Sequence, residues 1–417
     1  MICYKDVNRF GETLRCAPNR MLIGAIIALV SSLILSGVVM ASDKVDTGKP
    51  KQPTSAPATS LKDSARTVVV EKTPIAHKAR PHKSKTRLYG FITEYYDNNI
   101  LNYSDSDRAT YEALTSTNQR FAIKALADYI TDVGLRFTYE GGGRRSEMWR
   151  LRVKGDATLL ANNDYRNYTL WGFEIRRNIH RSHVELGVTY LPKYNLRNLS
   201  WRPMPSRPLG ERYTAAEFKR LTYDFEFGSA LSKKMDWRMN FSLGSTDYKI
   251  PFDERDNTTL GESTRLTLDL SKRATIYGGF GFRQSRADGR NMAVELVNDI
   301  NYANPVQTVP KDISYNAKTA EIGWRMECDR RGRIVAASSF DYQNQKYTSQ
   351  EPLDTGHFDR VDHDYDLDLS LSWRVSDVWQ PELNYAYRSS SSTVVAGAGE
   401  FGSFSGYRLG MQLTAYF

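Results

Sequence analysis

Two short segments of the chain carry rows of like charge at alternate positions. In "RVDHDYDLDLSLSW" (360–373) carboxylates alternate with apolar residues, and in "EMWRLRVKGD" (147–156) basic residues do the same. Side chains at alternate positions of an extended chain lie on one face, so each segment predicts one charged face. The charged residues are Asp362, Asp364, Asp366 and Asp368 in the first segment and Arg150, Arg152 and Lys154 in the second.

The two rows allow two interpretations. If they face each other across water, they create a transverse electric field that acts on charged or dipolar solutes. Alternatively, each row forms structural ion pairs with neighbouring charges, for which the sequence offers Arg136, Arg176, Arg374 and Arg388. The interpretations are compatible, and both place the rows on the inner wall of a water-filled pore.

Hydrolytic chemistry would need a nucleophile that an adjacent base activates. The candidate bases are His357 and His363, with Ser370, Ser372 and Asp359 in the same part of the chain. No nucleophile elbow or other motif fixes the geometry of these residues. We therefore predict no catalytic residue and no enzymatic activity, and we keep hydrolysis of lipid or peptide as an alternative.

The segment "YDNNILNYSDSDR" (96–108) concentrates the oxygen ligands that a hard cation such as Ca²⁺ prefers. Its spacing lacks the central glycine and the final glutamate of an EF-hand loop. The sequence therefore predicts a solvated loop here, no metal site and no cofactor.

From Arg87 to Phe417 the chain alternates apolar and polar residues in fourteen segments separated by turns. Its mean hydropathy is only −0.54, with 25 Tyr and 28 Gly, which indicates many short alternating strands rather than long apolar runs. Short and long connections alternate along the chain. The short ones are 141–146, 232–236, 270–274, 329–333 and 376–380, and the long ones are 97–127, 191–219, 247–262, 285–313, 344–360 and 389–403.

Such alternation of loop lengths is typical of an up-and-down barrel of the outer membrane, with short turns on the periplasmic side. Fourteen apolar faces would leave too wide an interior for side chains to fill, so we expect these faces to contact lipid. On the first strand, the predicted outward residues are Tyr89, Phe91 and Tyr95. The fold class is thus an all-β transmembrane antiparallel barrel of about 14 strands over 87–417.

The N-terminal residues form two other segments. Lys5, Arg9, Arg15 and Arg20 precede an apolar run, and small residues follow it, so 1–41 is predicted to be a signal peptide. A retained membrane anchor is the alternative, because about 20 apolar residues can span a bilayer. Residues 42–86 carry ten Lys/Arg against four Asp/Glu and almost no aromatic residue, which predicts a disordered basic tail.

The chain ends in "YRLGMQLTAYF", with apolar residues at alternate positions. They are Tyr407, Leu409, Met411, Leu413 and Phe417. This ending resembles the C-terminal insertion signal of Gram-negative outer-membrane barrels, which the barrel assembly machinery reads. The segment "EYYDNNI" (94–100) is similar to the start of a group of β-barrel porins, several of which accompany exopolysaccharide systems.

These features predict an outer-membrane channel for small polar or charged solutes in a Gram-negative bacterium, with its tail in the periplasm. The alternative is a barrel component of an exopolysaccharide export or assembly system, with the long connection at 191–219 folded inward as a plug. The expected partners are outer-membrane lipid, lipopolysaccharide and the assembly machinery. Peptidoglycan or a periplasmic protein is a further candidate for the basic tail, and no nucleic-acid motif is present.

Overall fold

The computed structural model describes residues 84–113, 123–141, 147–201, 212–250, 252–289, 312–329, 331–350, 354, 356–393 and 403–417. The predicted signal peptide and almost all of the predicted tail lie outside the described residues. The first strand begins at Lys85, two residues before the predicted barrel boundary at Arg87.

The described residues form fourteen strands and three short helices. The strands are β1 (Lys85–Asp97), β2 (Asp128–Gly141), β3 (Trp149–Leu160), β4 (Tyr168–Ile179), β5 (Ser182–Trp201), β6 (Arg212–Ala230), β7 (Met235–Tyr248), β8 (Asn257–Asp269), β9 (Ala274–Ala287), β10 (Tyr315–Glu327), β11 (Ile334–Tyr347), β12 (Val361–Trp373), β13 (Trp379–Thr393) and β14 (Phe404–Tyr416). The helices are α2 (Asp105–Ala113), η3 (Asp164–Arg166) and η4 (Asp253–Arg255).

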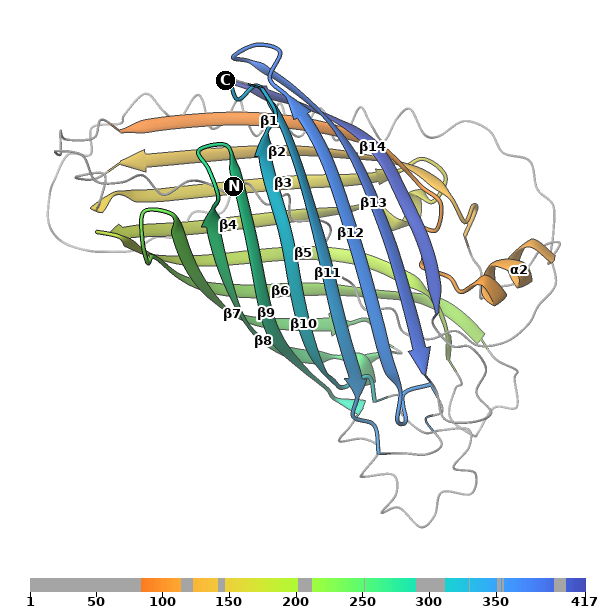
Figure 1. The fold of residues 1–417 in the computed structure, drawn as a ribbon. Helices are drawn as coiled ribbons and strands as arrows, with labels where there is room; N and C mark the ends of the chain where they lie inside the picture. The colour runs from red at the N-terminus through yellow and green to blue at the C-terminus, as the bar shows by residue number, and fades with distance from the viewer. Residues whose placement is uncertain are drawn as a thin grey trace, which may run out of the picture. The chain divides into compact units, whose positions relative to one another are not determined.

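Each strand pairs with its sequence neighbours in antiparallel register, and β14 pairs with β1 to close a barrel (Figure 1). At the seam, Tyr89 lies opposite Tyr416 and Asp97 opposite Arg408. The predicted closed antiparallel barrel of fourteen strands is therefore confirmed. None of the described helices is long and apolar enough to cross a bilayer.

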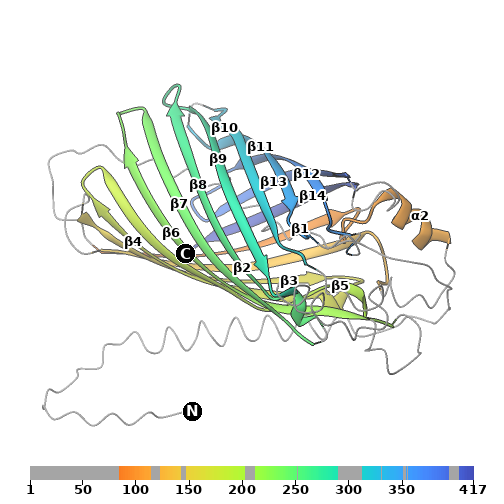
Figure 2. The same ribbon diagram turned by 90° about the horizontal axis from the view of Figure 1, so that it is seen from below.

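Short and long connections alternate as the sequence predicted. Three short turns share one geometry, in which a serine hydroxyl accepts a hydrogen bond from a backbone N–H further along the turn. The serines are Ser232, Ser271 and Ser376. Helix α2 lies beyond the strand ends, at the end of the barrel where β5 and β6 extend (Figure 2). We call the edge with the short turns the short-turn rim and the opposite edge the long-loop rim.

The connection predicted at 191–219 is mostly strand. β5 continues to Trp201 and β6 begins at Arg212, and the two pair along most of this length. Register shifts between Leu191 and Tyr194 and between Asn195 and Asn198 mark irregularities or bulges in β5. Such bulges break the period of two, which explains why the sequence pattern was misread. The prediction of an inward-folded plug is wrong for the described part of this segment.

Large apolar side chains line the outer face of the barrel. They include Trp171, Phe173, Leu186, Phe280, Ile322 and Leu409, and these residues occupy the outward positions that the sequence predicted. The predicted face of β1 is wrong, because Ile92 is exposed while Phe91 lies against the inward Arg136. An apolar outer band on a closed sheet is the arrangement that a membrane accepts, so the chain is a transmembrane barrel of the outer-membrane type.

Candidate functional site in the barrel lumen

The basic row lies on the inner face of β3, where carboxylates of the next strands pair with it. Arg152 lies opposite Glu174 in register, and their Nη1 and Oε2 atoms are 2.7 Å apart. Lys154 Nζ reaches the other oxygen of Glu174 at 2.9 Å. Arg150 Nη2 lies 3.3 Å from Glu185 Oε2 on β5. The charges of the row are therefore offset by glutamates on the next two strands, β4 and β5.

Glycines opposite long side chains make this packing possible. A Cβ atom at Gly172 would lie 2.1 Å from Lys154 Cε, and one at Gly228 would lie 2.1 Å from His183 Cε1. The stems of Lys154 and His183 therefore lie flat across the neighbouring strand. This places His183 Nε2 2.9 Å from Glu226 Oε1.

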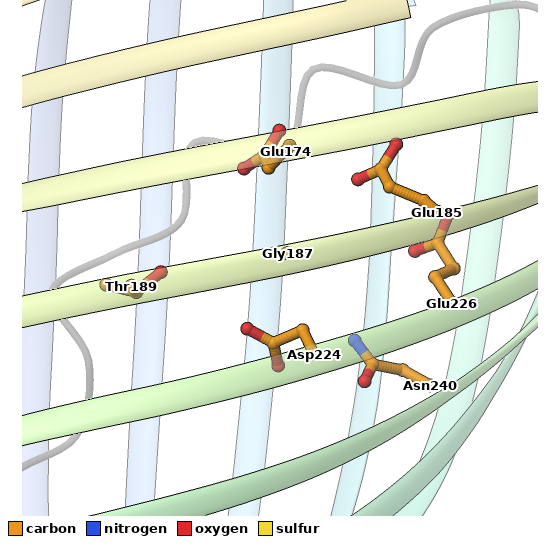
Figure 3. Close-up of a pocket in the computed structure, with 7 residues that line it drawn as sticks. All are labelled: Glu174, Glu185, Gly187, Thr189, Asp224, Glu226 and Asn240. Atoms are coloured by element: carbon orange, nitrogen blue, oxygen red, sulfur yellow. The ribbon is translucent and has the colours of Figure 1, made fainter. Parts of the chain in front are cut away.

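Beside the basic row, four carboxylates gather around a small hollow in the inner wall. They are Glu174 on β4, Glu185 on β5, and Asp224 and Glu226 on β6 (Figure 3). Gly187, Thr189 and Asn240 complete the lining. Because Arg152, Lys154 and Arg150 already contact two of these carboxylates, the wall here is a network of mixed charge.

The acidic row lies on the inner face of β12, where its member Asp364 accepts hydrogen bonds from neutral side chains. Asp364 accepts hydrogen bonds from Ser390 Oγ at 2.7 Å and Gln343 Nε2 at 3.2 Å. In register, Asp366 lies opposite Arg388 on β13, and Asp368 lies opposite Ala386.

At the long-loop end of the row, Asp362 forms a bidentate ion pair with Arg360. The Nε–Oδ1 and Nη2–Oδ2 distances are 2.8 and 2.9 Å. The side chains of Arg360 and Asp362 are 3% and 9% exposed, so this pair is buried. It fixes the start of β12 to the loop that precedes it.

The two rows lie five strands apart around the ring, through β2, β1, β14 and β13. The structure thus places both rows on the inner wall and far from each other, while the basic row is paired as the second sequence interpretation described. Two of the four other named arginines are also paired: Arg136 with Asp156, and Arg176 with Glu185 at 3.7 Å. Arg388 lies opposite Asp366 in register, and Arg374 lies over the Tyr416 ring.

The loop between β1 and β2 packs against the inner wall at the long-loop rim. Its residues Ile100, Leu101 and Tyr103 are buried against Ile130 of β2 and Leu160 of β3. Asn99 fixes the bend, because its side chain accepts a hydrogen bond from Tyr103 N at 2.9 Å and donates to Tyr103 O at 2.8 Å. This part of the loop is therefore fixed to the inner wall, and no sequence pattern identified it.

Arg166 of η3 joins this loop to β5. Its Nη1 donates to Ile100 O at 2.9 Å, its Nε to Asn195 O at 3.1 Å and its Nη2 to Tyr194 Oη at 2.7 Å. A second apolar cluster continues along the inner wall from there, formed by Leu191, Leu196, Ala216, Phe218, Tyr248 and Phe252. At the long-loop rim, the inner wall thus carries the β1–β2 loop and, beside it, a cluster that includes aromatic side chains.

Arginine side chains lie over aromatic rings at six places on the inner wall and at its mouth. The pairs, with the distance from Cζ to the ring centre, are Arg136–Phe91 (5.1 Å), Arg408–Tyr95 (5.0 Å), Arg265–Tyr277 (4.7 Å), Arg220–Phe218 (5.4 Å), Arg166–Tyr194 (5.5 Å) and Arg360–Tyr347 (4.9 Å). Sequence reasoning missed these pairs, because their members mostly lie on different strands and two of the rings were assigned to the outer face.

The candidate catalytic residues do not come together. His363 lies beside Tyr342, with its Nδ1 2.9 Å from Tyr342 Oη, on the outer face. Ser370 and Ser372 follow at positions of opposite parity, which point to the lumen. His357 is buried, and its Nδ1 lies 2.9 Å from Asp354 Oδ1. No hydroxyl nucleophile contacts either histidine at a hydrogen-bond distance among the residues that the structure describes, apart from the Tyr342 phenol.

Burial lowers the pKa of His357, an effect that Asp354 opposes and that Arg255 and Arg360 reinforce. His357 therefore stays neutral at neutral pH in the loop before β12. The oxygen-rich segment around Asp97 is also accounted for, since Asp97 Oδ2 binds Arg408 Nε at 2.6 Å. Within the described ranges, no group of three or more His, Cys, Asp or Glu residues could hold a metal ion.

The residues of the predicted assembly signal lie on β14 and just after it. Tyr407, Leu409, Met411 and Leu413 are exposed on the outer face, and Phe417 is 76% exposed beyond the last strand. The backbone N–H of Phe417 donates to Leu88 O at 2.8 Å, so the final residue extends the seam with β1.

Neither a protein-family model nor a curated protein sequence matches the chain. Among solved structures, it is similar to an anion-selective porin from Comamonas acidovorans, with 9% identity and a TM-score of 0.37 over 80% of this chain and 100% of that chain. The outer membrane channel DcaP of Acinetobacter baumannii has 9% identity and a TM-score of 0.39, over 80% and 97%. The outer membrane protein OprD from Pseudomonas aeruginosa has 11% identity and a TM-score of 0.35, over 80% and 94%. At these TM-scores we draw no conclusion about this chain from the likeness.

Proposed function

We propose that this protein is an outer-membrane channel for small polar or charged solutes. The observation that carries the proposal is the contrast between the two faces of one closed sheet: apolar side chains cover the outside, while paired and hydrogen-bonded charges line the inside. A lumen lined in this way favours water and ions over lipid.

The preferred solute follows from the balance of charge along the wall. The basic row of β3 is offset by glutamates, whereas the acidic row of β12 has Ser390 and Gln343 as partners of Asp364. Arg360 pairs with Asp362 and Arg388 lies opposite Asp366, so four carboxylates of β12 have these two arginines beside them. From this excess of carboxylates we propose a moderate preference for cations.

A second candidate is a barrel that serves exopolysaccharide export or assembly. The six arginine–aromatic pairs support it, because flat rings beside guanidinium groups suit contacts with sugar rings and with acidic sugars. Hydrolysis of lipid or peptide has no comparable support, since the histidines and serines of the described region lie apart.

We further propose that the protein lies in the outer membrane of a Gram-negative bacterium, with the short-turn rim and the tail in the periplasm. The short turns support this orientation, as do the positions of Lys85 and Phe417 on that rim. Phe417 and the outward residues of β14 would be presented to the assembly machinery, and lipopolysaccharide would surround the opposite rim.

Planar-bilayer recording of the refolded protein tests the channel. We expect discrete conductance steps and a reversal potential on the cation-selective side in a salt gradient. A silent bilayer containing correctly folded protein would overturn the proposal. Conductance blocked by an acidic oligosaccharide, but not by a neutral one of equal length, would favour the polysaccharide barrel.

A further inference from the structure

The short-turn rim carries a ring of exposed cations. Among the described residues they are Lys85, Arg87, Arg181, Lys233, Lys234, Lys272, Arg273, Arg331, Arg333 and Arg374. Carboxylates are scarce in the described residues of these turns. Asp329 binds the backbone N–H groups of Arg331 and Ile334 in its own turn, which leaves Asp377 as an exposed acid. The rim is therefore basic around most of the barrel.

The cations of the two rims differ in their partners. On the long-loop rim, Lys124 pairs with Asp164 at 2.9 Å, Lys193 with Glu217 at 3.1 Å and Lys219 with Asp247 at 2.8 Å. On the short-turn rim, a set of seven cations forms no ion pair with any described residue. They are Arg181, Lys233, Lys234, Arg273, Arg331, Arg333 and Arg374. Their charge is available to a partner outside the barrel.

Exposed aliphatic residues lie next to these cations in five of the turns on this rim, those after β4, β6, β8, β10 and β12. Leu270, 54% exposed, precedes Lys272 and Arg273, and Val375, 61% exposed, follows Arg374. Ile179, Leu231 and Ile334 occupy equivalent positions beside the other cations. An aliphatic side chain beside a long cationic one is the arrangement found where apolar groups enter a bilayer and charged ends reach its surface.

The turn backbone holds this arrangement in place. In the turns after β6 and β8, Leu231 N and Ser232 N donate to Met235 O, and Leu270 N and Ser271 N donate to Ala274 O. The same geometry recurs after β12, where Val375 N and Ser376 N donate to Trp379 O. Lysine and arginine thus occupy the third and fourth positions of two identical turns, at the edge of the apolar band.

We propose that the short-turn rim binds the phosphate headgroups of anionic phospholipids in the leaflet that it adjoins. The inference rests on the proposed membrane orientation, in which this leaflet faces the periplasm. β1 begins at Lys85 on the same rim, and in the sequence the basic segment 42–86 leads into it, with ten Lys/Arg against four Asp/Glu.

A lipid ligand fits better than a cell-wall polymer or an acidic protein. The cations are spread around a ring instead of forming one patch, as are the headgroups that surround a barrel. The exposed aliphatic residues between them also have a place in a lipid layer, whereas a polymer in water would leave them hydrated.

The test measures how strongly anionic lipid associates with the refolded chain of residues 42–417. Vesicles contain equal amounts of zwitterionic phosphatidylcholine and anionic phosphatidylglycerol, and spin-labelled forms of each lipid report their relative association with the barrel. Since one cation near an anionic surface contributes a factor of about five in binding, we expect a severalfold preference for phosphatidylglycerol that weakens as salt rises.

Two matched variants distinguish charge from shape. The neutral variant, Lys233→Ser, Lys234→Ser, Arg331→Ser and Arg333→Ser, should lose at least half of the preference. The charge-preserving variant, Lys233→Arg, Lys234→Arg, Arg331→Lys and Arg333→Lys, should retain it. A long-loop control, Lys124→Ser with Lys193→Ser, should leave the preference unchanged.

Equal association of both lipids with the wild-type chain would overturn the inference, and so would an unchanged preference in the neutral variant. Retention on isolated peptidoglycan that depends on the same four cations, without any lipid preference, would assign the rim to the cell wall instead. Conductance recorded from the same preparations distinguishes the two proposals. A folded barrel that prefers phosphatidylglycerol but conducts no ions would contradict the proposed channel and leave the lipid inference standing.

Discussion

The inner wall at β3–β5 and the inner wall at β12 begin from the same kind of sequence pattern but differ in their final charge. On β3, Arg152 and Lys154 meet Glu174, and Arg150 meets Glu185. On β12, Asp364 meets a serine and a glutamine. The basic row is offset by glutamates, whereas the acidic row combines an arginine partner at Asp362 with neutral hydrogen-bond donors at Asp364.

The difference comes from the neighbouring strands, because cross-strand partners are the nearest groups on one face of a sheet. Register puts Glu174 opposite Arg152 and Glu185 opposite Arg176. The same kind of register puts Ser390 and Gln343 opposite Asp364. A row of like charge in one strand therefore says little about the field of a pore until its two neighbours are placed beside it.

The largest change in selectivity should come from removing charge from the acidic wall at β12. Asp364→Asn with Asp366→Asn removes two negative charges while keeping hydrogen-bonding capacity. Because one charge at close range in water is worth about 1 kcal/mol, the cation-to-anion permeability ratio should fall by roughly fivefold. Reversal potentials in a salt gradient measure the effect.

The matched control is Asp359→Asn, which removes an exposed carboxylate at the loop before β12. It should leave the ratio nearly unchanged. Equal permeability ratios for wild type and the double variant would mean that the β12 wall carries no effective field, and the contrast between the walls would then lack a functional consequence.

Removing the carboxylate charge that offsets the basic row should cause a smaller change in selectivity and should also lower the stability of the barrel. Glu174→Gln leaves Arg152 and Lys154 without their shared carboxylate, so the lumen should become less cation-selective. The side chains of this pair are 30% and 12% exposed, and we expect unfolding to become easier by about 1–2 kcal/mol, below the value for a fully buried pair. Urea unfolding in lipid vesicles and reversal potentials measure the two effects.

For comparison, Asp377→Asn removes an exposed carboxylate from a short turn and should change neither quantity. If Glu174→Gln were as stable as wild type and had the same selectivity, Glu174 would not offset the charge of the basic row, and this part of the comparison would be wrong.

A third test concerns the loop that anchors the β12 wall through Arg360 and Asp362. Burial lowers the pKa of His357 in this loop below that of an exposed histidine. Its contribution to loop stability is therefore present above the unfolded pKa of about 6.5 and is lost as pH falls through and below that value. Amide hydrogen exchange of 356–360 should accelerate at acidic pH.

In His357→Gln the exchange of these amides should lose most of its pH dependence after correction for the intrinsic rate. The loop at Ile100–Tyr103, which packs on the inner wall and contains no histidine, serves as the internal reference. Acceleration of both loops by the same factor would point to general loosening of the barrel and not to His357.

The sequence alone predicted the strand count, the closure and the faces of all strands but one. It succeeded wherever one parity was apolar and the other polar, as on β12. It failed on β1, where Tyr89, Phe91 and Tyr95 alternate with Leu88, Ile92 and Tyr96, so hydropathy does not separate the faces. There the stacking of Arg136 on Phe91 shows the inner face, and it depends on β2.

The pairing of the charged rows could not be predicted for a related reason. Glu174 lies 22 residues from Arg152, and its partner is chosen by the register of β3 and β4. The bulges of β5 likewise replace a predicted loop by strand, because an extra residue shifts the alternation. The faces of single strands could thus be predicted from their own residues, whereas the pairing of side chains between strands depends on the register of the sheet.

Deletion of Phe417 should have the smallest effect on selectivity, because this residue lies on neither wall. Its ring is exposed beyond β14 and its backbone extends the seam at Leu88. We expect the yield of folded barrel in cells to fall, while single-channel conductance and reversal potential of the refolded protein stay at wild-type values. Phe417→Tyr, which keeps an aromatic end, should assemble nearly as well as wild type. Folded yield is measured by the shift in electrophoretic mobility on heating. A change in selectivity together with normal assembly would contradict this prediction, because it would show that the seam also sets the field in the lumen.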